Sequence, residues 1–202
     1  MGPDLNRKDA IMRRVFAVLL VLPVLALTAP SARGDDYVVD DVHSSMSFRI
    51  SHLGISWVHG RFNKFAGTFT VDKASPEKSR FEMTIPVDSI DTNQKMRDAH
   101  LLSPEFFDAQ KFPQITFKST SVKPVKDGLE VTGDFTMRGV TRPLTFTLKG
   151  GKEAPFMGKQ RIGYSTELVL KRSDFGVGGE NFKPPVLGDE VYIAIGFEGV
   201  KK

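Results

Sequence analysis

The sequence contains no cysteine among its 202 residues. This absence excludes disulfides, catalytic thiols, thiolate metal sites and lipid attachment through a cysteine side chain. Histidine is also scarce, with four residues, and tryptophan occurs only once. The folded chain must therefore depend on its hydrophobic core for stability.

The sequence also lacks an apolar run long enough to span a bilayer. The apolar run from Val15 to Leu27 is shorter than the roughly twenty residues that a membrane span needs. Four basic residues precede this run and small residues follow it, which is typical of an export signal. We therefore predict that residues 1–34 are a signal peptide, cleaved before Asp35, and that the protein is periplasmic or secreted. An uncleaved anchor is the alternative, and Met12 is an alternative start.

Charge of one sign is not in large excess once the predicted signal peptide is removed. Residues 1–34 carry five of the 28 basic and two of the 24 acidic residues, which leaves 23 and 22, a net charge of +1. Such a chain lacks the basic surface typical of nucleic-acid binders, so no nucleic-acid partner is expected. Residues 35–202 are long enough to form one domain with a sizeable core.

Apolar and polar residues alternate through most of residues 35–202, which is the pattern of strands with one apolar face. Turn residues separate the strands by short connections, which favours antiparallel neighbours. Helix-forming residues at 93–102 interrupt the pattern between the third and fourth strands. The sequence thus predicts an all-β antiparallel protein of about eight strands with one inserted helix. The predicted strands contain residues 46–50, 65–71, 81–85, 115–117, 129–135, 144–148, 162–168 and 191–197.

Sixteen phenylalanines lie mostly on the apolar side of these strands. They are equally consistent with a filled β-sandwich core and with a barrel whose inner face surrounds a ligand cavity, because eight strands allow either interior. Periodicity alone leaves these two architectures open.

Three of the four histidines, His43, His52 and His59, lie close together in the sequence. Their spacings of nine and seven are odd, so neighbours on one regular strand would face opposite sides. Hydrogen bonds at turns are therefore favoured over metal binding, with contact to a ligand head group as a further option. Arg97 and His100 on the inserted helix allow the same choice between a structural role and a ligand-binding role.

Several segments together resemble the YceI-like family of exported, lipocalin-like lipid-binding proteins. The similarity covers residues 37 to 199 in the order of the family. The segments that carry it are Asp41 with His43 and Ser44, His52–Gly54, Gly60–Phe62, Phe65–Gly67, Arg97–Leu101, Phe106–Asp108, Phe112–Ser119, Gly133–Pro143, Arg172–Gly176 and Asp189–Val191.

The resemblance implies a lipocalin-like barrel of about eight strands around an elongated apolar cavity. The implied ligand is a polyisoprenoid, such as a quinone or a prenyl phosphate, or another long-chain amphiphile. A lining rich in phenylalanine and methionine suits a flexible chain. The residues expected to contact the ligand are Phe48, Phe69, Phe81, Met83, Phe117, Phe135, Phe146, Ile162, Tyr164 and Ile193, with the polar residues His52, Arg97, His100 and Arg172.

Binding, storage or transport without catalysis follows from the same resemblance, and no cofactor, catalytic residue or metal ligand is expected. The sequence contains no GxSxG nucleophile elbow, in keeping with this expectation. The alternative is a stress-related or redox-partner module that binds a small molecule, a quinone or a metal through its histidines. The sequence leaves both a monomer and a homodimer open.

Overall fold

A computed structural model describes residues 34–202, so the predicted signal peptide lies outside the described residues except for Gly34. Within the described residues no helix has the length and apolar character needed to cross a membrane. The elements are β1 (Asp35–His52), β2 (Ser56–Phe62), β3 (Ala66–Val71), β4 (Arg80–Pro86), β5 (Ile90–Asp91), α1 (Lys95–Leu101), β6 (Gln114–Val125), β7 (Gly128–Met137), β8 (Val140–Phe156), β9 (Lys159–Lys171) and β10 (Leu187–Lys201).

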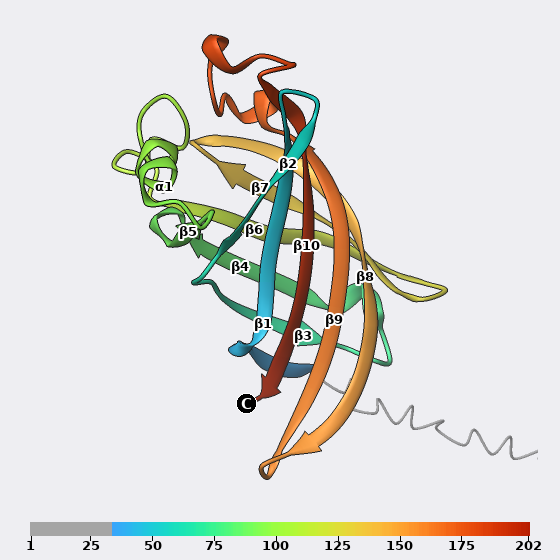
Figure 1. Ribbon diagram of the computed structural model, residues 1–202. Coiled ribbons are helices and arrows are strands. Elements are labelled where there is room, and N and C mark those ends of the chain that lie inside the picture. Colours follow the sequence, from blue (N-terminus) through green and yellow to red (C-terminus); the bar gives the residue numbers. More distant parts are fainter. Residues whose placement is uncertain (1–33) are drawn as a thin grey trace, which may run out of the picture. The chain divides into compact units, whose positions relative to one another are not determined.

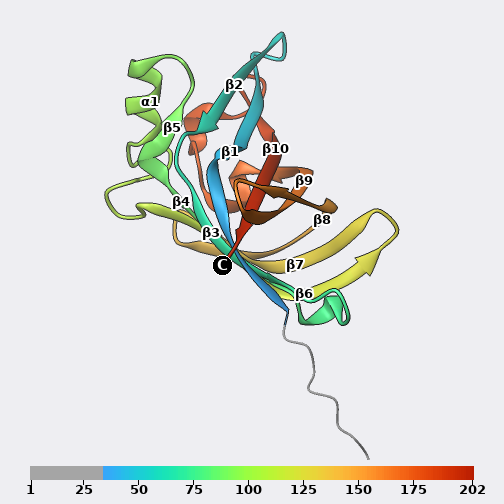
Figure 2. The same ribbon diagram turned by 90° about the horizontal axis from the view of Figure 1, so that it is seen from below.

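Eight of the strands in residues 34–202 form a closed antiparallel barrel (Figures 1 and 2). Their order around the barrel is β1, β10, β9, β8, β7, β6, β4 and β3, and β3 pairs with β1 again to close it. These are the eight strands that the alternation of the sequence predicts. Closure removes the exposed strand edges that an open sheet would present.

The first strand is long because it serves two parts of the sheet. Its lower half, Asp35–Val38, pairs with β3, and its upper half, Ser47–His52, pairs with β2. Between the two halves the register with β10 shifts, so that the residues between Asp40 and Ser45 form a bulge opposite Phe197. Bulges increase strand twist, which helps a sheet of this length to close.

Two short strands and the helix lie outside the barrel order. β2 extends from the upper half of β1, and β5 pairs with β2 through Arg61 and Phe62. The helix α1 spans Lys95–Leu101, inside the predicted range 93–102, and lies between β4 and β6 in the chain. Neither β2 nor β5 was predicted, because β5 has only two residues and Gly60 interrupts the apolar alternation of β2 between Val58 and Phe62.

Two hydrophobic clusters pack in the interior of the barrel. The first contains the aromatic residues of β3, β4, β9 and β10 together with Tyr37 of β1. It packs so closely that Gly199 of β10 cannot be larger, because a Cβ there would lie 2.1 Å from Cζ of Phe69. The second joins the barrel to the segment that follows α1, through Phe106, and to the segment between β9 and β10, through Val177.

Candidate ligand-binding cavity

A cavity of about 440 Å³ lies inside the barrel. This volume is within the range of roughly 300 to 1,000 Å³ that is usual for ligand pockets. Its wall is largely apolar because alternate residues of each barrel strand face inward. The second half of β9 shows the pattern, since Leu168 and Leu170 line the cavity and Val169 between them is exposed.

Twelve of the fourteen residues that the sequence analysis proposes as ligand contacts line this cavity. The other two, Ile162 and Tyr164, lie in the packed cluster below it and are almost completely buried. They belong to the floor of the barrel rather than to the cavity wall. The twelve wall residues are Phe48, His52, Phe69, Phe81, Met83, Arg97, His100, Phe117, Phe135, Phe146, Arg172 and Ile193.

Aromatic rings form the floor. Phe69 stacks on Tyr37 with centroids 5.1 Å apart and on Phe81 at 5.5 Å, and it meets Phe197 edge to face. Tyr164 packs edge-on against Phe69 and Phe81. Burial raises the pKa of Tyr164 to about 12, so its phenol stays neutral at physiological pH. The floor is therefore closed and uncharged.

Several wall residues were not identified from the sequence. Alternation would have added Ile50 and Ile195, which share an inward face with the predicted Phe48 and Ile193. No periodic signal marks Phe106, Phe182 and Val186, because they lie in irregular segments that fold back over the barrel end. Their contribution depends on tertiary packing rather than on strand pattern.

Four of the wall residues that are exposed to solvent lie at the mouth of the cavity. They are His52 at the end of β1, Arg97 and His100 on α1, and Val186 just before β10. These residues come from three separate segments, which meet at the same end of the barrel (Figure 1). Three polar side chains of the wall, those of His52, Arg97 and His100, thus lie where a ligand head group would reach water.

Arg97 is held at the mouth by Thr92. Its Nε donates to Thr92 Oγ1 at 2.8 Å, and a terminal nitrogen donates to the Thr92 carbonyl at 2.6 Å. Asp98 accepts from the Thr92 backbone at 2.9 Å, which fixes the start of α1 to β5. Among residues 34–202 no carboxylate lies within ion-pair distance of Arg97, so its charge is available to a ligand.

His100 is oriented by the segment that follows α1. Its Nε2 lies 2.8 Å from Glu105 Oε2, and its ring meets Phe106 edge to face at 4.9 Å. The hydrogen bond from His100 is the main cause of a lowered pKa of the Glu105 carboxyl, with Asn181 adding to it. These contacts fix the imidazole beside the mouth.

Arg172 is a buried cation whose partners are backbone carbonyls. It donates to Val177 at 2.7 Å, Gly188 at 2.8 Å and Leu187 at 3.2 Å, and also to Phe182. Burial lowers its pKa below the usual arginine range. The side chain thereby joins the segment between β9 and β10 to the start of β10, and forms part of the cavity wall.

Thr166 is the polar exception deep in the wall. It is buried, and its Oγ1 has no hydrogen-bond partner among the protein atoms of residues 34–202. An unpaired buried hydroxyl costs roughly 1 to 3 kcal/mol. Thr166→Val keeps the side-chain shape. We therefore expect its free energy of unfolding, measured by urea titration, to equal that of the unmodified protein or to exceed it by about 1 kcal/mol.

The matched control for this change is Thr132→Val, because the Thr132 hydroxyl bonds that of Thr145 at 2.8 Å. The free energy of unfolding of Thr132→Val should be equal to or lower than that of the unmodified protein. A loss of stability in Thr166→Val alone would show that its hydroxyl has a partner of its own.

The histidines do not converge. His52 lines the cavity. His59 is exposed and follows Val58, which lines the cavity, so the side chains of Val58 and His59 face opposite sides of β2. His43 lies on the bulge of β1, with its Nδ1 2.8 Å from Asp40 Oδ2. Metal binding by all three, the alternative raised from the sequence, therefore has no common site here.

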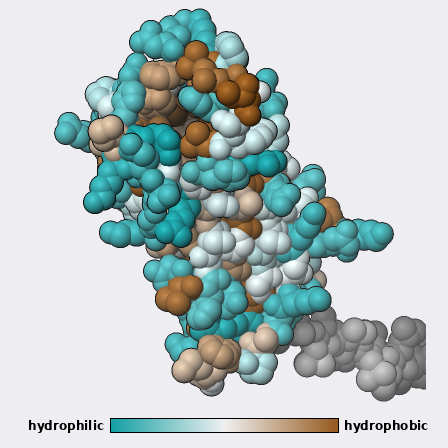
Figure 3. Space-filling view, in the orientation of Figure 1, coloured by the Kyte–Doolittle hydropathy of each residue, from teal (hydrophilic) through white to brown (hydrophobic). Residues whose placement is uncertain are grey.

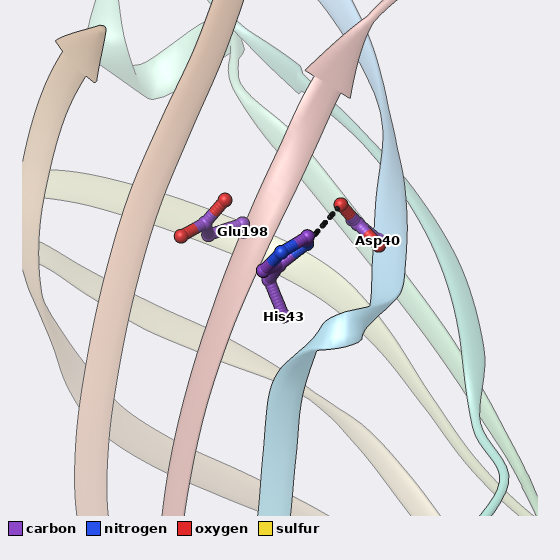
Figure 4. A group of neighbouring side chains, drawn as sticks. All are labelled: Asp40, His43 and Glu198. Atoms are coloured by element: carbon purple, nitrogen blue, oxygen red, sulfur yellow. Dashed lines mark hydrogen bonds and ion pairs between the residues drawn. The ribbon is translucent and has the colours of Figure 1, made fainter. Parts of the chain in front are cut away.

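His43 does lie near two carboxylates, of Asp40 and of Glu198 on β10 (Figure 4). The ligand atoms of the three residues lie within 4.8 Å of one another. Arg161 of β9 donates to both carboxylates, at 3.1 Å in the case of Glu198, and already offsets one of their two negative charges. We interpret this group as an ion-pair network that fixes the bulge, together with Ser44, whose hydroxyl accepts from the Glu198 backbone.

Asp40 should make the stability of the barrel sensitive to acid. Hydrogen bonds from Arg161 and then His43 lower its pKa to about 2. A lowered pKa stabilises the fold above the ordinary carboxyl pKa near 4, and this contribution is lost as the pH falls toward 2. We expect Asp40→Asn to lower the free energy of unfolding at pH 7 by on the order of 1 to 2 kcal/mol, and to flatten its fall between pH 4 and pH 2.

Chemical denaturation at several pH values measures this effect. The exposed neighbour Asp41 provides the control, because Asp41→Asn leaves the network intact. If the free energy of unfolding falls equally steeply between pH 4 and pH 2 in Asp40→Asn and in the unmodified protein, Asp40 is not the source of the acid sensitivity.

The barrel, the closed aromatic floor and the polar mouth can be compared with known proteins. The model of the YceI-like domain matches residues 37–199. The chain belongs to the YceI-like family. A curated relative, Protein YceI of Salmonella arizonae, is 42% identical over 188 residues, covering 90% of this chain and 95% of the relative.

Several solved structures share the fold of this chain. BcnA of Burkholderia cenocepacia has a TM-score of 0.70 and 30% identity, covering 79% of this chain and 98% of that one. The YCEI protein of Campylobacter jejuni has a TM-score of 0.65 and 30% identity, covering 75% and 90%. A polyisoprenoid binding domain from Saccharophagus degradans has a TM-score of 0.64 over 82% and 98% of the chains, and at 16% identity it supports the YceI-like fold alone.

Proposed function

We propose that this YceI-like protein binds, stores or transports a polyisoprenoid, such as a quinone or a prenyl phosphate, or another long-chain amphiphile, in the periplasm and without catalysis. The observation that carries the proposal is the cavity, whose wall is largely apolar and whose mouth carries Arg97, His52 and His100. The domain from Saccharophagus degradans, described as polyisoprenoid binding, supports the same ligand class.

The tail of such a ligand would supply the affinity. Burying one methylene is worth roughly 0.8 kcal/mol, so a prenyl chain of about forty carbons nominally exceeds the practical affinity limit of about 20 kcal/mol. Ordering and desolvation costs remove much of this excess. The polar groups at the mouth therefore need only orient the head group.

Identification of the ligand tests the proposal directly. The protein is purified without denaturants or detergent, extracted with organic solvent, and the extract is analysed by mass spectrometry. We expect a long-chain amphiphile in stoichiometric or near-stoichiometric amount. Repeated extracts that contain no such molecule, or only small polar ones, would count decisively against lipid binding.

Arg97 should distinguish the two head-group classes. Its guanidinium is at the mouth without an acidic partner among the described residues, and phosphate is its preferred ligand chemistry. We expect Arg97→Gln to weaken binding of a prenyl phosphate about tenfold and binding of a quinone with the same tail by less than about twofold. Calorimetric titration of delipidated protein measures both.

Lys95→Gln is the control for this experiment, because Lys95 lies on the same helix but does not line the cavity. Equal weakening for both ligands in Arg97→Gln would assign Arg97 to the structure of the mouth rather than to head-group recognition.

A further inference from the structure

The turn between β1 and β2 exposes apolar side chains in an unusual concentration. Ile55 is 83% exposed, Leu53 47% and Trp57 45%. Val186, 41% exposed, lies beside them, since the Leu53 backbone nitrogen donates to the Val186 carbonyl at 3.1 Å. We call these four residues, with Arg49 and Tyr192 described below, the mouth patch.

The mouth patch is continuous with the cavity. His52 and Val58, on either side of the turn, line the cavity, and so does Val186 itself. The space-filling view shows apolar side chains gathered around a recess at this end of the barrel (Figure 3). A ligand that leaves the cavity here passes directly over these apolar side chains.

The outer face of the mouth patch joins aromatic rings and a cation. Trp57 meets Tyr192 edge to face, with centroids 5.4 Å apart. The Arg49 guanidinium lies over both rings, 4.7 Å from Trp57 and 5.2 Å from Tyr192. Within residues 34–202 no carboxylate is within ion-pair distance of Arg49. Tryptophan, tyrosine and a cation on an aliphatic base are the side chains that favour the boundary between lipid and water.

We propose that the mouth patch docks reversibly on the surface of a phospholipid bilayer. Leu53 and Ile55 enter the boundary between head groups and acyl chains, and Arg49 faces the lipid phosphates. The cavity mouth then opens toward the bilayer. This inference rests on the proposed lipid ligand for its purpose, because a long-chain amphiphile could pass between cavity and membrane without crossing water.

The size of the mouth patch favours a membrane over a protein partner. A stable protein interface uses roughly twenty to thirty residues on each side. Six residues on and beside one turn fall well short of this number, whereas a few apolar side chains with a cation are enough for reversible adsorption to anionic lipid.

Trp57 provides the measurement, because it is the only tryptophan in the sequence. The purified protein is titrated with vesicles of phosphatidylethanolamine and phosphatidylglycerol, and with vesicles that carry brominated acyl chains. We expect a blue shift of the Trp57 emission and quenching by the brominated lipid. Co-flotation with the vesicles gives the partition coefficient.

The decisive variant is Leu53→Asn with Ile55→Ser. Leu53 and Gly54 both have positive φ, at 54° and 72°, and a turn of this kind favours Asn-Gly, so the hairpin keeps its geometry. We expect the partition coefficient to fall at least about tenfold. Trp57 and the cavity wall are unchanged in this variant.

A matched control lies at the opposite end of the barrel, in the turn between β8 and β9 (Figure 1). Phe156 and Met157 there are 49% and 85% exposed, and the φ values of Met157 and Gly158, 50° and 75°, are close to those of Leu53 and Gly54. Met157→Asn with Phe156→Ser should bind vesicles like the unmodified protein. Every variant carries the same N-terminal segment, so any contribution from that segment cancels.

Several outcomes would overturn the docking proposal. They are an unshifted Trp57 emission, equal flotation of the two double variants, and a shift that depends on protein concentration without vesicles, which would indicate self-association instead. Lipid extraction of the same samples separates this proposal from the proposed function. If the Leu53→Asn, Ile55→Ser variant still contains its lipid but does not co-float with the vesicles, docking is supported. If the unmodified protein binds vesicles but contains no lipid, docking is supported and the ligand proposal fails.

Discussion

Arg172→Met is expected to lower the free energy of unfolding by about 3 to 5 kcal/mol, measured by urea denaturation. The guanidinium is buried and donates to four backbone carbonyls in the segments before and at the start of β10. Its removal leaves these carbonyls without a donor, and each unpaired buried group costs roughly 1 to 3 kcal/mol. Methionine keeps much of the length of the side chain, so the loss reports on the hydrogen bonds rather than on an empty space.

The exposed neighbour Lys171 gives the control, since Lys171→Met changes the same charge without a buried contact. Arg172→Lys should fall between the two, because an ammonium group keeps the charge but cannot reach four carbonyls with one planar fork. If Arg172→Met unfolds at the same urea concentration as Lys171→Met, the carbonyls must have other donors.

Filling the cavity should abolish lipid loading while the barrel remains folded. Leu168 of β9 and Ile193 of β10 are directly opposite each other in the register, and both line the cavity. We expect Leu168→Trp with Ile193→Trp to reduce the lipid that co-purifies with the protein by at least about tenfold. The free energy of unfolding should change by less than about 1 kcal/mol, because the cavity has room for the indoles and cross-strand aromatic pairs are favourable.

Val131→Trp serves as the contrasting control, because Val131 is completely buried in the floor cluster and does not line the cavity. Added volume there should cost roughly 1 to 3 kcal/mol or more. The comparison also tests the filled-core alternative raised from the sequence. If the cavity-filling variant is destabilised as much as Val131→Trp, the interior is packed and the ligand proposal loses its basis.

The period-two alternation was enough to predict the eight barrel strands and their inward faces. Phe48 and Phe81 were assigned to the interior because each is flanked by polar residues, and both line the cavity. The same pattern could not predict how far along the barrel axis each inward side chain lies. Ile162 and Tyr164 lie on the inward face of β9, but they belong to the packed floor, because alternation specifies the face of a strand and carries no information on where the cavity ends.

Features that depend on irregular segments were beyond prediction. Arg172 was proposed as a ligand contact, but its four carbonyl partners follow from how the segment before β10 folds back, which has no periodic signal. The strand β2 was not predicted, since Gly60 interrupts its apolar alternation. The exposure of Trp57 and Ile55 therefore became visible only in three dimensions.

The pairing of β1 with β10 joins the first and last strands of the described chain. The barrel consequently cannot close until Leu187–Lys201 is present, and a chain that ends between β9 and β10 carries two open strand edges, one on β1 and one on β9. Contacts this distant in sequence slow folding, since the longest loop must be closed to form them. We therefore expect the barrel to close late in folding, and until then the unpaired edges of its sheet are open to aggregation.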